Sequence, residues 1–125
     1  MTITDISGCR SKSGCAMSTD YKELAAWQKS MDLVRKVYRC MRSFPREEMF
    51  GLSSQMRRAA VSVPSNIAEG KGRYSRKELI QFLYKARGSL LELETQIIIA
   101  RDLDYMNDAT TRSLSATTLE VEPNS

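Results

Sequence analysis

The stretch Gly51–Ala100 decides the fold, and it reads GLSSQMRRAAVSVPSNIAEGKGRYSRKELIQFLYKARGSLLELETQIIIA. Apolar residues recur every three or four positions on both sides of a short basic segment at 71–74. This spacing places apolar side chains along one face of an α-helix. The stretch therefore predicts two long helices joined by a basic turn.

The turn is marked on both sides by residues that favour helix ends. Gly70 closes the first apolar pattern, and it predicts a C-terminal cap with a left-handed backbone. Ser75 and Glu78 are spaced as a capping box, in which each side chain bonds an unpaired backbone N–H. The second helix is expected from about Arg76 to Asp104. Its apolar stripe is Leu79, Phe82 or Leu83, Ala86, Leu90, Leu93, Ile97 and Ala100.

The first of the two helices contains a proline. Its apolar stripe is Leu52, Met56, Ala59, Val63 and Ile67, with Ala60 beside it. Pro64 would cost about 3 kcal/mol in a regular helix. Because the apolar period continues through it, we predict one kinked helix; a break with Ser62 capping a new helix is the alternative. Ser62, Ser65 and Asn66 are expected to bond the carbonyl groups that the proline frees.

A further helix is predicted ahead of this stretch, from about Asp20 to the residue before Pro45. Asp20 and Glu23 are spaced as a second capping box. The apolar residues again follow a spacing of three and four: Leu24, Trp27, Met31, Val34, Tyr38 and Met41. Trp27 and Tyr38 lie on this stripe, so we expect them in the core or in a subunit interface rather than stacked on bases.

The two ends of the chain lack this periodicity. Residues 1–18 are rich in Ser, Gly and Thr, and they predict a disordered tail. The pattern collapses after 106, and residues 107–125 predict a short weak helix or a disordered end. Three amphipathic helices need a fourth stripe or a partner chain to cover them. We therefore expect an all-α, up-down antiparallel bundle over 19–106, with three long helices and a weak or truncated fourth in 107–125.

Composition and length exclude several classes of protein. The 125 residues suffice for one domain, and 42% of them are hydrophobic and 27% charged, as in ordinary globular proteins. No apolar run approaches the ~18 residues of a membrane span, and the N-terminus lacks the apolar core of a secretory signal. Three cysteines without a CxxC motif, and no histidine, favour a cytoplasmic chain with reduced thiols and without metal or cofactor.

Few residues of the chain suit catalysis. Without histidine there is no Ser–His or Cys–His pair and no Glu-x-x-His metal motif. Glu92 and Glu94 are two positions apart, so they face different sides of a helix and make a poor acid–base pair. The segment 70–72, Gly-Lys-Gly, lacks the spacing of a phosphate-binding P-loop. We therefore expect a protein that is not an enzyme.

Positive charge is concentrated in the deciding stretch. From 57 to 87 the chain has eight basic and two acidic residues, a net charge of +6, whereas the whole chain carries +4. The candidate binding residues are Arg57, Arg58, Lys71, Arg73, Arg76, Lys77, Lys85 and Arg87. Four of them, from Lys71 to Lys77, surround the start of a helix, where free N–H groups and the helix dipole favour phosphate. The pattern predicts binding to the backbone of RNA or DNA.

Two other interpretations of the charge remain open. One is a solvated helix face on which charges pair between helices, with Arg57, Arg58 and Arg87 opposite Glu69, Glu92 or Glu94. The other is a protein–protein module or scaffold, with the basic face as its docking surface and no direct contact with nucleic acid.

Two long blocks carry a resemblance to a known family: SQMRRAAVSVPSNIAEG at 54–70 and ARGSLLELETQ at 86–96. With the segments 21–34 and 44–48, they make residues 20–106 closely similar to the bacterial four-helix bundle proteins of the 23S rRNA intervening-sequence type. The resemblance implies an up-down four-helix bundle and a homo-oligomer, and it brings no catalytic residues. After 106 the chain departs from the acidic, Leu-rich fourth helix of that family.

A related protein extends what the resemblance implies about partners. The accessory variability protein of diversity-generating retroelements is similar to this family, and it forms a pentameric barrel that binds nucleic acid and reverse transcriptase. The resemblance thus implies RNA or DNA as a partner, assembly into a homo-oligomer such as a pentamer, and a protein partner such as a reverse transcriptase.

Overall fold

The computed structural model describes residues 21–121, and all regular elements in this range are helical. The four α-helices are α2 (Ala25–Cys40), α3 (Leu52–Lys71), α4 (Arg76–Asp102) and α5 (Asp108–Val121). Single 3-10 turns lie at η2 (Tyr21–Glu23), η3 (Met41–Ser43) and η4 (Arg46–Glu48). The predicted tail at 1–18 lies outside the described residues. None of the described helices is long and apolar enough to cross a membrane.

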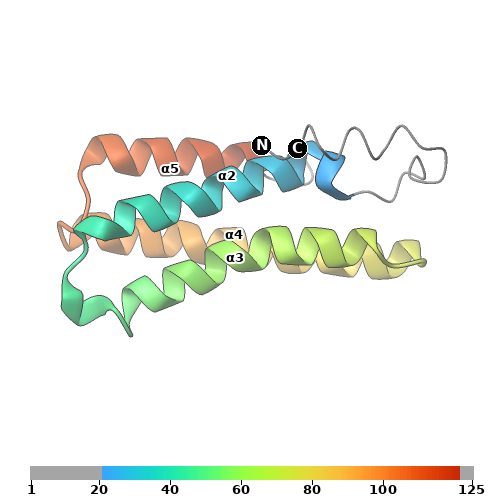
Figure 1. The fold of residues 1–125 in the computed structure, drawn as a ribbon, viewed down its shortest axis with the longest axis horizontal. Helices are drawn as coiled ribbons and strands as arrows, with labels where there is room; N and C mark the ends of the chain where they lie inside the picture. The colour runs from blue at the N-terminus through green and yellow to red at the C-terminus, as the bar shows by residue number, and fades with distance from the viewer. Residues whose placement is uncertain (1–20, 122–125) are drawn as a thin grey trace.

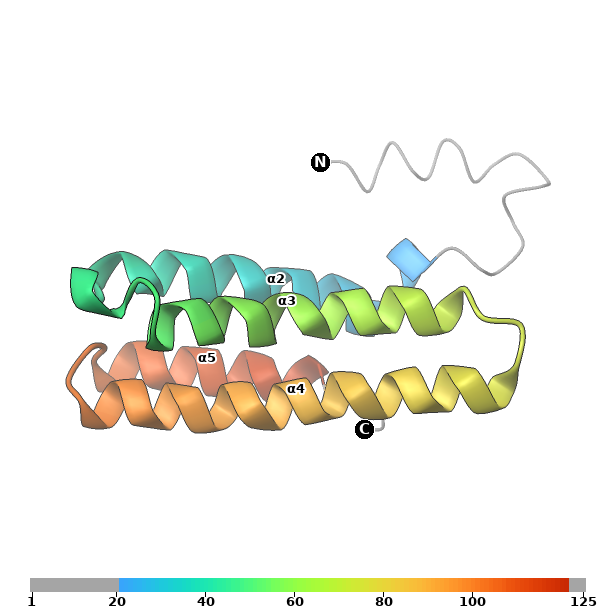
Figure 2. The same cartoon turned by 90° about the horizontal axis from the view of Figure 1, so that it is seen from below.

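The four helices form one antiparallel bundle in up-down order, which confirms the predicted all-α fold class. Each helix packs against its neighbours in the chain, and α5 returns to pack against α2 (Figures 1 and 2). The turn between α3 and α4 lies at one end of the bundle. The connections from α2 to α3 and from α4 to α5 lie together at the other end (Figure 1).

The stripes predicted for α3 and α4 form the centre of the core. The buried apolar residues of these two helices are Met56, Ala59, Ala60, Val63, Ile67, Ala86, Leu90, Leu93, Ile97 and Ala100. Leu52 and Leu83 pack against them from the side. The observed α4 ends at Asp102, two residues before the predicted end, and Asp104 follows with a positive φ of 64°.

Pro64 lies inside a single helix, as predicted, and α3 changes direction along its length (Figure 1). The predicted role of the neighbouring polar residues is wrong. The Asn66 side chain donates to the carbonyl and hydroxyl oxygens of Ser62, at 2.8 and 2.9 Å, and not to the carbonyl of Ala60 that the proline frees. Ser62 is in turn bonded to Ser89 of α4 at 2.7 Å. The polar block therefore connects α3 to α4.

Gly70 does not have the predicted left-handed conformation. No described glycine has a positive φ, and α3 continues through Gly70 to Lys71, with Gly72 at the C-cap. A Cβ atom at Gly70 would lie 2.7 Å from the Cβ of Phe82. Gly70 is therefore required for the close approach of α3 and α4. The predicted cap at Ser75 is confirmed, because its Oγ accepts the backbone N–H of Glu78 at 3.3 Å.

The core-facing stripe of α2 is displaced by about one residue from the prediction. Ser30, Leu33 and Val37 are fully buried, whereas Tyr38 is 47% exposed and lies outside the core of the single chain. Trp27 packs against the core from the side. The helix begins at Ala25 without a side-chain cap at Leu24, and the predicted cap at Asp20 lies outside the described residues. The prediction failed because apolar residues cover a face wider than one stripe.

The fourth helix, α5, is the shortest of the four at 14 residues. Leu114 and Val121 are buried, and so are three threonines, Thr111, Thr117 and Thr118. The predicted short helix is therefore present over 108–121, and the alternative of a disordered end is wrong there. Because α5 covers α2 and α4, the bundle is closed within one chain.

The end of the bundle opposite the α3–α4 turn is closed by polar bonds. Glu48 accepts the N–H of Leu52 through Oε1 at 2.9 Å and the hydroxyl of Tyr105 through Oε2 at 2.8 Å. These two bonds hold the pKa of Glu48 below its usual value, with the Leu52 bond as the larger cause. The rings of Tyr105 and Phe44 are 5.3 Å apart, and Ser43 donates to the Tyr105 carbonyl. These contacts join the α2–α3 connection to the α4–α5 connection.

Candidate nucleic-acid interface

Five of the eight predicted cations lie together at the α3–α4 turn. We call this group the turn patch, and its members are Lys71, Arg73, Arg76, Lys77 and Lys85. The α3–α4 turn lies at one end of the bundle, and the α2–α3 and α4–α5 connections lie at the opposite end (Figure 2). All members except the half-buried Lys71 are exposed. The patch is therefore open to a large partner.

Phe82 organises part of the turn patch. The guanidinium of Arg73 lies 4.8 Å from the centroid of the Phe82 ring, and the ammonium of Lys85 lies 4.5 Å from it. Such cation–π contacts hold positive groups over an aromatic face. Phe82 is also the residue against which Gly70 packs, so the same close helix contact fixes the position of two cations.

Apart from Arg73, the cations of the turn patch form no ion pair with the described residues. Arg73 pairs with Glu69 at 2.7 Å. Lys71, Arg76 and Lys77 make no ion pair or hydrogen bond with any residue in 21–121. Arg76 and Lys77 are the first two residues of α4, whose positive dipole end adds to their charge. The turn thus presents unneutralised positive charge to an anionic partner.

Tyr74 is a residue that the sequence analysis did not single out. It lies in the turn between Arg73 and Ser75, and its side chain is fully exposed. An aromatic ring without core contacts, flanked by cations, suits stacking on nucleic-acid bases. The signal in the sequence is the segment Arg-Tyr-Ser-Arg-Lys at 73–77, where an aromatic residue interrupts basic ones.

The other three predicted cations lie away from the turn patch. Arg57 is 14 residues before Lys71 on α3, about 21 Å along the axis, and it donates to the carbonyl of Met49. Arg58 lines a small polar pocket of about 270 Å³ that includes Glu92. Arg87 is exposed on α4, and its side chain is not without a partner. The structure therefore does not unite all eight cations in one surface, and Glu69 pairs with Arg73 rather than with Arg57 or Arg58.

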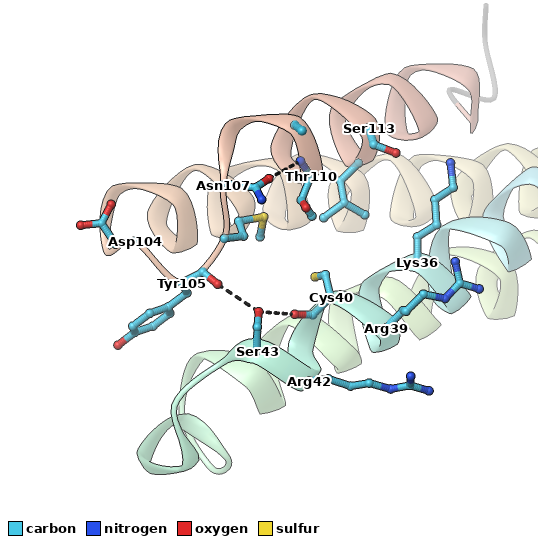
Figure 3. A pocket seen from close by; sticks show the side chains of 13 residues that line it. Lys36, Arg39, Cys40, Arg42, Ser43, Asp104, Tyr105, Asn107, Thr110 and Ser113 are labelled. Carbon is cyan, nitrogen blue, oxygen red and sulfur yellow. Dashed lines mark hydrogen bonds between the residues drawn. The ribbon is translucent and has the colours of Figure 1, made fainter.

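A second basic region lies at the opposite end of the bundle. A hollow of about 900 Å³ separates the last turns of α2 from the start of α5, and Lys36, Arg39 and Arg42 line it (Figure 3). Cys40 lies in the same lining, and burial raises the pKa of its thiol to about 11. The thiol is therefore protonated at neutral pH and is a poor nucleophile. The sequence analysis missed this region because its residues come from helices 60 or more positions apart.

No group of three or more potential metal ligands occurs within residues 21–121. The chain matches the protein family described as 23S rRNA-intervening sequence protein over residues 22–123. No curated protein matches the chain significantly. The family match continues through α5, although the resemblance noted from the sequence ended at about 106. Because the match spans all four helices, this chain belongs to the 23S rRNA-intervening sequence protein family.

Proposed function

We propose that this protein is a non-enzymatic helical bundle that binds RNA through the turn patch. The observation that carries the proposal is the gathering of five cations at one end of the bundle, four of them without a counter-ion among the described residues. The family description names an intervening sequence of ribosomal RNA, which supports RNA as the partner. Contacts of this kind are made with phosphates, so they tolerate different sequences and weaken as salt increases.

Tyr74 favours RNA with unpaired bases over a continuous duplex. A base that is already unstacked can lie on an exposed aromatic ring, and such stacking contributes about 1–3 kcal/mol per base. In an A-form duplex the bases are paired and stacked, so the ring would find only backbone and groove edges. Loops, bulges and single-stranded ends are therefore the expected substrates.

The decisive experiment measures RNA affinity as a function of salt concentration for a variant of the turn patch. The triple variant K71Q/R76Q/K77Q removes the three cations without partners and leaves Arg73 on Phe82 and Glu69. With three fewer phosphate contacts, the slope of log affinity against log salt should fall by about 2 on single-stranded RNA. Filter binding of a labelled hairpin with an unpaired loop supplies the measurement.

A matched control separates the turn patch from the overall charge of the protein. The variant R35Q/R46Q/R112Q removes the same number of exposed charges from other parts of the bundle. It should bind the hairpin with nearly unchanged slope. Equal losses in the two triple variants would mean that the turn patch has no special role.

A second candidate function is a homo-oligomeric scaffold. Ile80, Tyr84, Leu91 and Ile98 form a stripe on α4 at intervals of four, seven and seven residues, and each is between 42 and 62% exposed. An apolar stripe that faces away from the core favours contact with another protein surface. Light scattering coupled to size exclusion, with and without RNA, tests this function. A defined oligomer that ignores RNA at low salt would favour the scaffold and contradict RNA binding.

A further inference from the structure

The hollow at the closed end of the bundle has the dimensions of a small-molecule site. Its volume of about 900 Å³ lies within the range of about 300–1,000 Å³ that is usual for ligand pockets. One wall is the last turns of α2 and the adjoining η3, and the other is the α4–α5 connection and the first turns of α5 (Figure 3). It lies at the opposite end of the bundle from the turn patch (Figure 1).

The charges of the lining favour a ligand with two negative charges. Lys36, Arg39 and Arg42 contribute three positive charges, and Asp104 contributes one negative charge. Lys36 reaches toward α5, where its Nζ lies 2.8 Å from Thr117 Oγ1, and it is also 3.9 Å from Asp32 (Figure 3). Arg39 and Arg42 form no ion pair or hydrogen bond with the described residues. Two guanidinium groups are thus available to an anion.

The position of Arg42 differs from that of the other two cations. Figure 3 shows its side chain pointing away from α5, so it stands at the rim of the hollow. Arg39 lies between Lys36 and Arg42 along α2 and is exposed. An arginine fork binds phosphate oxygens in a bidentate manner, which makes Arg39 the principal anion contact.

The α5 side of the hollow adds uncharged polar groups and an apolar floor. Asn107 uses its side-chain oxygen to accept the N–H of Thr110 at 2.8 Å, so this cap is already satisfied. Ser113 is exposed on the same wall. Met106 and Leu114 are almost fully buried beneath the hollow, and the apolar surface open to a ligand comes from the exposed Ala109 and the half-buried Cys40. The site thus combines cations at one wall with apolar surface at its base.

We propose that this hollow binds a phosphate monoester joined to an apolar group, with the 5′-phosphate of a nucleotide as the type of ligand. A phosphate monoester carries a charge of about −1.5 to −2 at pH 7, which matches the net charge of the lining better than a single carboxylate does. The phosphate lies against Arg39 and Lys36, and the apolar portion lies against Ala109 and Cys40. The site is separate from the turn patch and does not depend on the proposed RNA binding.

Two sources could supply this chemistry: a free nucleotide or the phosphorylated 5′ end of an RNA strand. Isothermal titration of the full chain with AMP, adenosine and inorganic phosphate tests the ligand class. AMP should bind at least about tenfold more tightly than adenosine, because adenosine lacks the charge-assisted bonds to arginine. A short oligonucleotide with a 5′-phosphate or a 5′-hydroxyl then separates the sources. Tighter binding of the 5′-phosphorylated than of the 5′-hydroxyl oligonucleotide, with the difference lost in R39Q/R42Q, would assign the site to RNA ends.

Variants at the two ends of the bundle make the test specific. R39Q/R42Q should weaken AMP binding by about tenfold or more while retaining the RNA affinity of the turn patch. S113W fills the hollow without changing its charge, and it should also abolish AMP binding. R76Q/K77Q should show the opposite pattern, with normal AMP binding and weakened RNA binding.

Three results would overturn the inference. They are the absence of AMP binding, equal affinities for AMP and adenosine, and equal losses of AMP binding in R39Q/R42Q and R76Q/K77Q. The last result would show that AMP responds only to the overall charge of the protein. Failure of RNA binding alone would contradict the proposed function and leave this site intact.

Discussion

The α3–α4 pair and the α2–α5 pair bury different kinds of side chain. Between α3 and α4 the core consists of Ala, Val, Leu, Ile and Met, with Ser53 and Gln96 as the buried polar residues. In α2 and α5 the buried set includes Ser30, Thr111, Thr117 and Thr118. The difference shows that a helix can join the core with buried hydroxyl side chains in place of part of its apolar stripe.

The buried hydroxyl groups of the α2–α5 pair are satisfied within their own helices. Thr118 donates to the carbonyl of Leu114 at 2.8 Å, Thr117 donates to Ser113 at 3.1 Å and Thr111 to Asn107 at 2.9 Å. A buried hydroxyl without a partner would cost about 1–3 kcal/mol. Because these bonds remove that cost, α5 buries polar side chains without an unpaired hydroxyl.

The largest expected effect concerns the close contact of the α3–α4 pair. Gly70→Ala would place a Cβ atom 2.7 Å from the Cβ of Phe82, so α3 and α4 must separate. We expect the free energy of unfolding to fall by about 1–3 kcal/mol, as for overpacked core sites. Urea denaturation followed by circular dichroism supplies the measurement.

Gly88→Ala is the matched control for this substitution. Gly88 lies in the interior of α4, and a Cβ atom there would have no neighbour within 4 Å. Alanine should raise the free energy of unfolding by about 0.5–1 kcal/mol, because glycine is a poor helix former. If both substitutions changed stability in the same direction, the close-contact explanation of Gly70 would be wrong.

A smaller effect is expected from the buried threonines of α5. Thr118→Val keeps the shape of the side chain, and the Leu114 carbonyl retains its backbone N–H partner in the helix. We expect a change in stability within about 0.5 kcal/mol. Thr118→Ser removes a buried methyl group instead, and it should cost about 1 kcal/mol. The reverse order in thermal unfolding would show that the hydroxyl, rather than the methyl group, stabilises α5.

The smallest effect concerns Glu48, which joins the two connections at the closed end. Its folded pKa is lowered, so its contribution to stability is present above the unfolded value near 4.5 and is lost as the pH falls through the folded pKa. Tyr105→Phe removes one of its two bonds and should move the NMR titration midpoint of Glu48 upward. The midpoint should remain below its usual value, because the Leu52 bond persists. An unchanged midpoint would mean that the Tyr105 bond is not formed in solution.

The candidate site was predictable in part. The cations from Lys71 to Lys77 are neighbours in the sequence. Because the end of α3 and the start of α4 can be predicted from local signals, the position of these cations around the turn can be predicted as well. Arg57 and Arg58 are equally basic, but about 20 Å of helix separates them from the turn. The basic hollow near Arg39 could not be predicted, since its walls come from α2 and from the region around α5.

The sequence by itself determined the three longer helices, their order and the four cations from Lys71 to Lys77 at the turn. Apolar spacing and local capping act between residues three or four positions apart, so they can be read without knowledge of the fold. Only the tertiary structure decided that Gly70 serves a close helix contact, that Phe82 holds two cations, and that a Thr-rich segment closes the bundle. Each of these depends on which surfaces meet across the bundle, and distant residues meet only after the helices have packed.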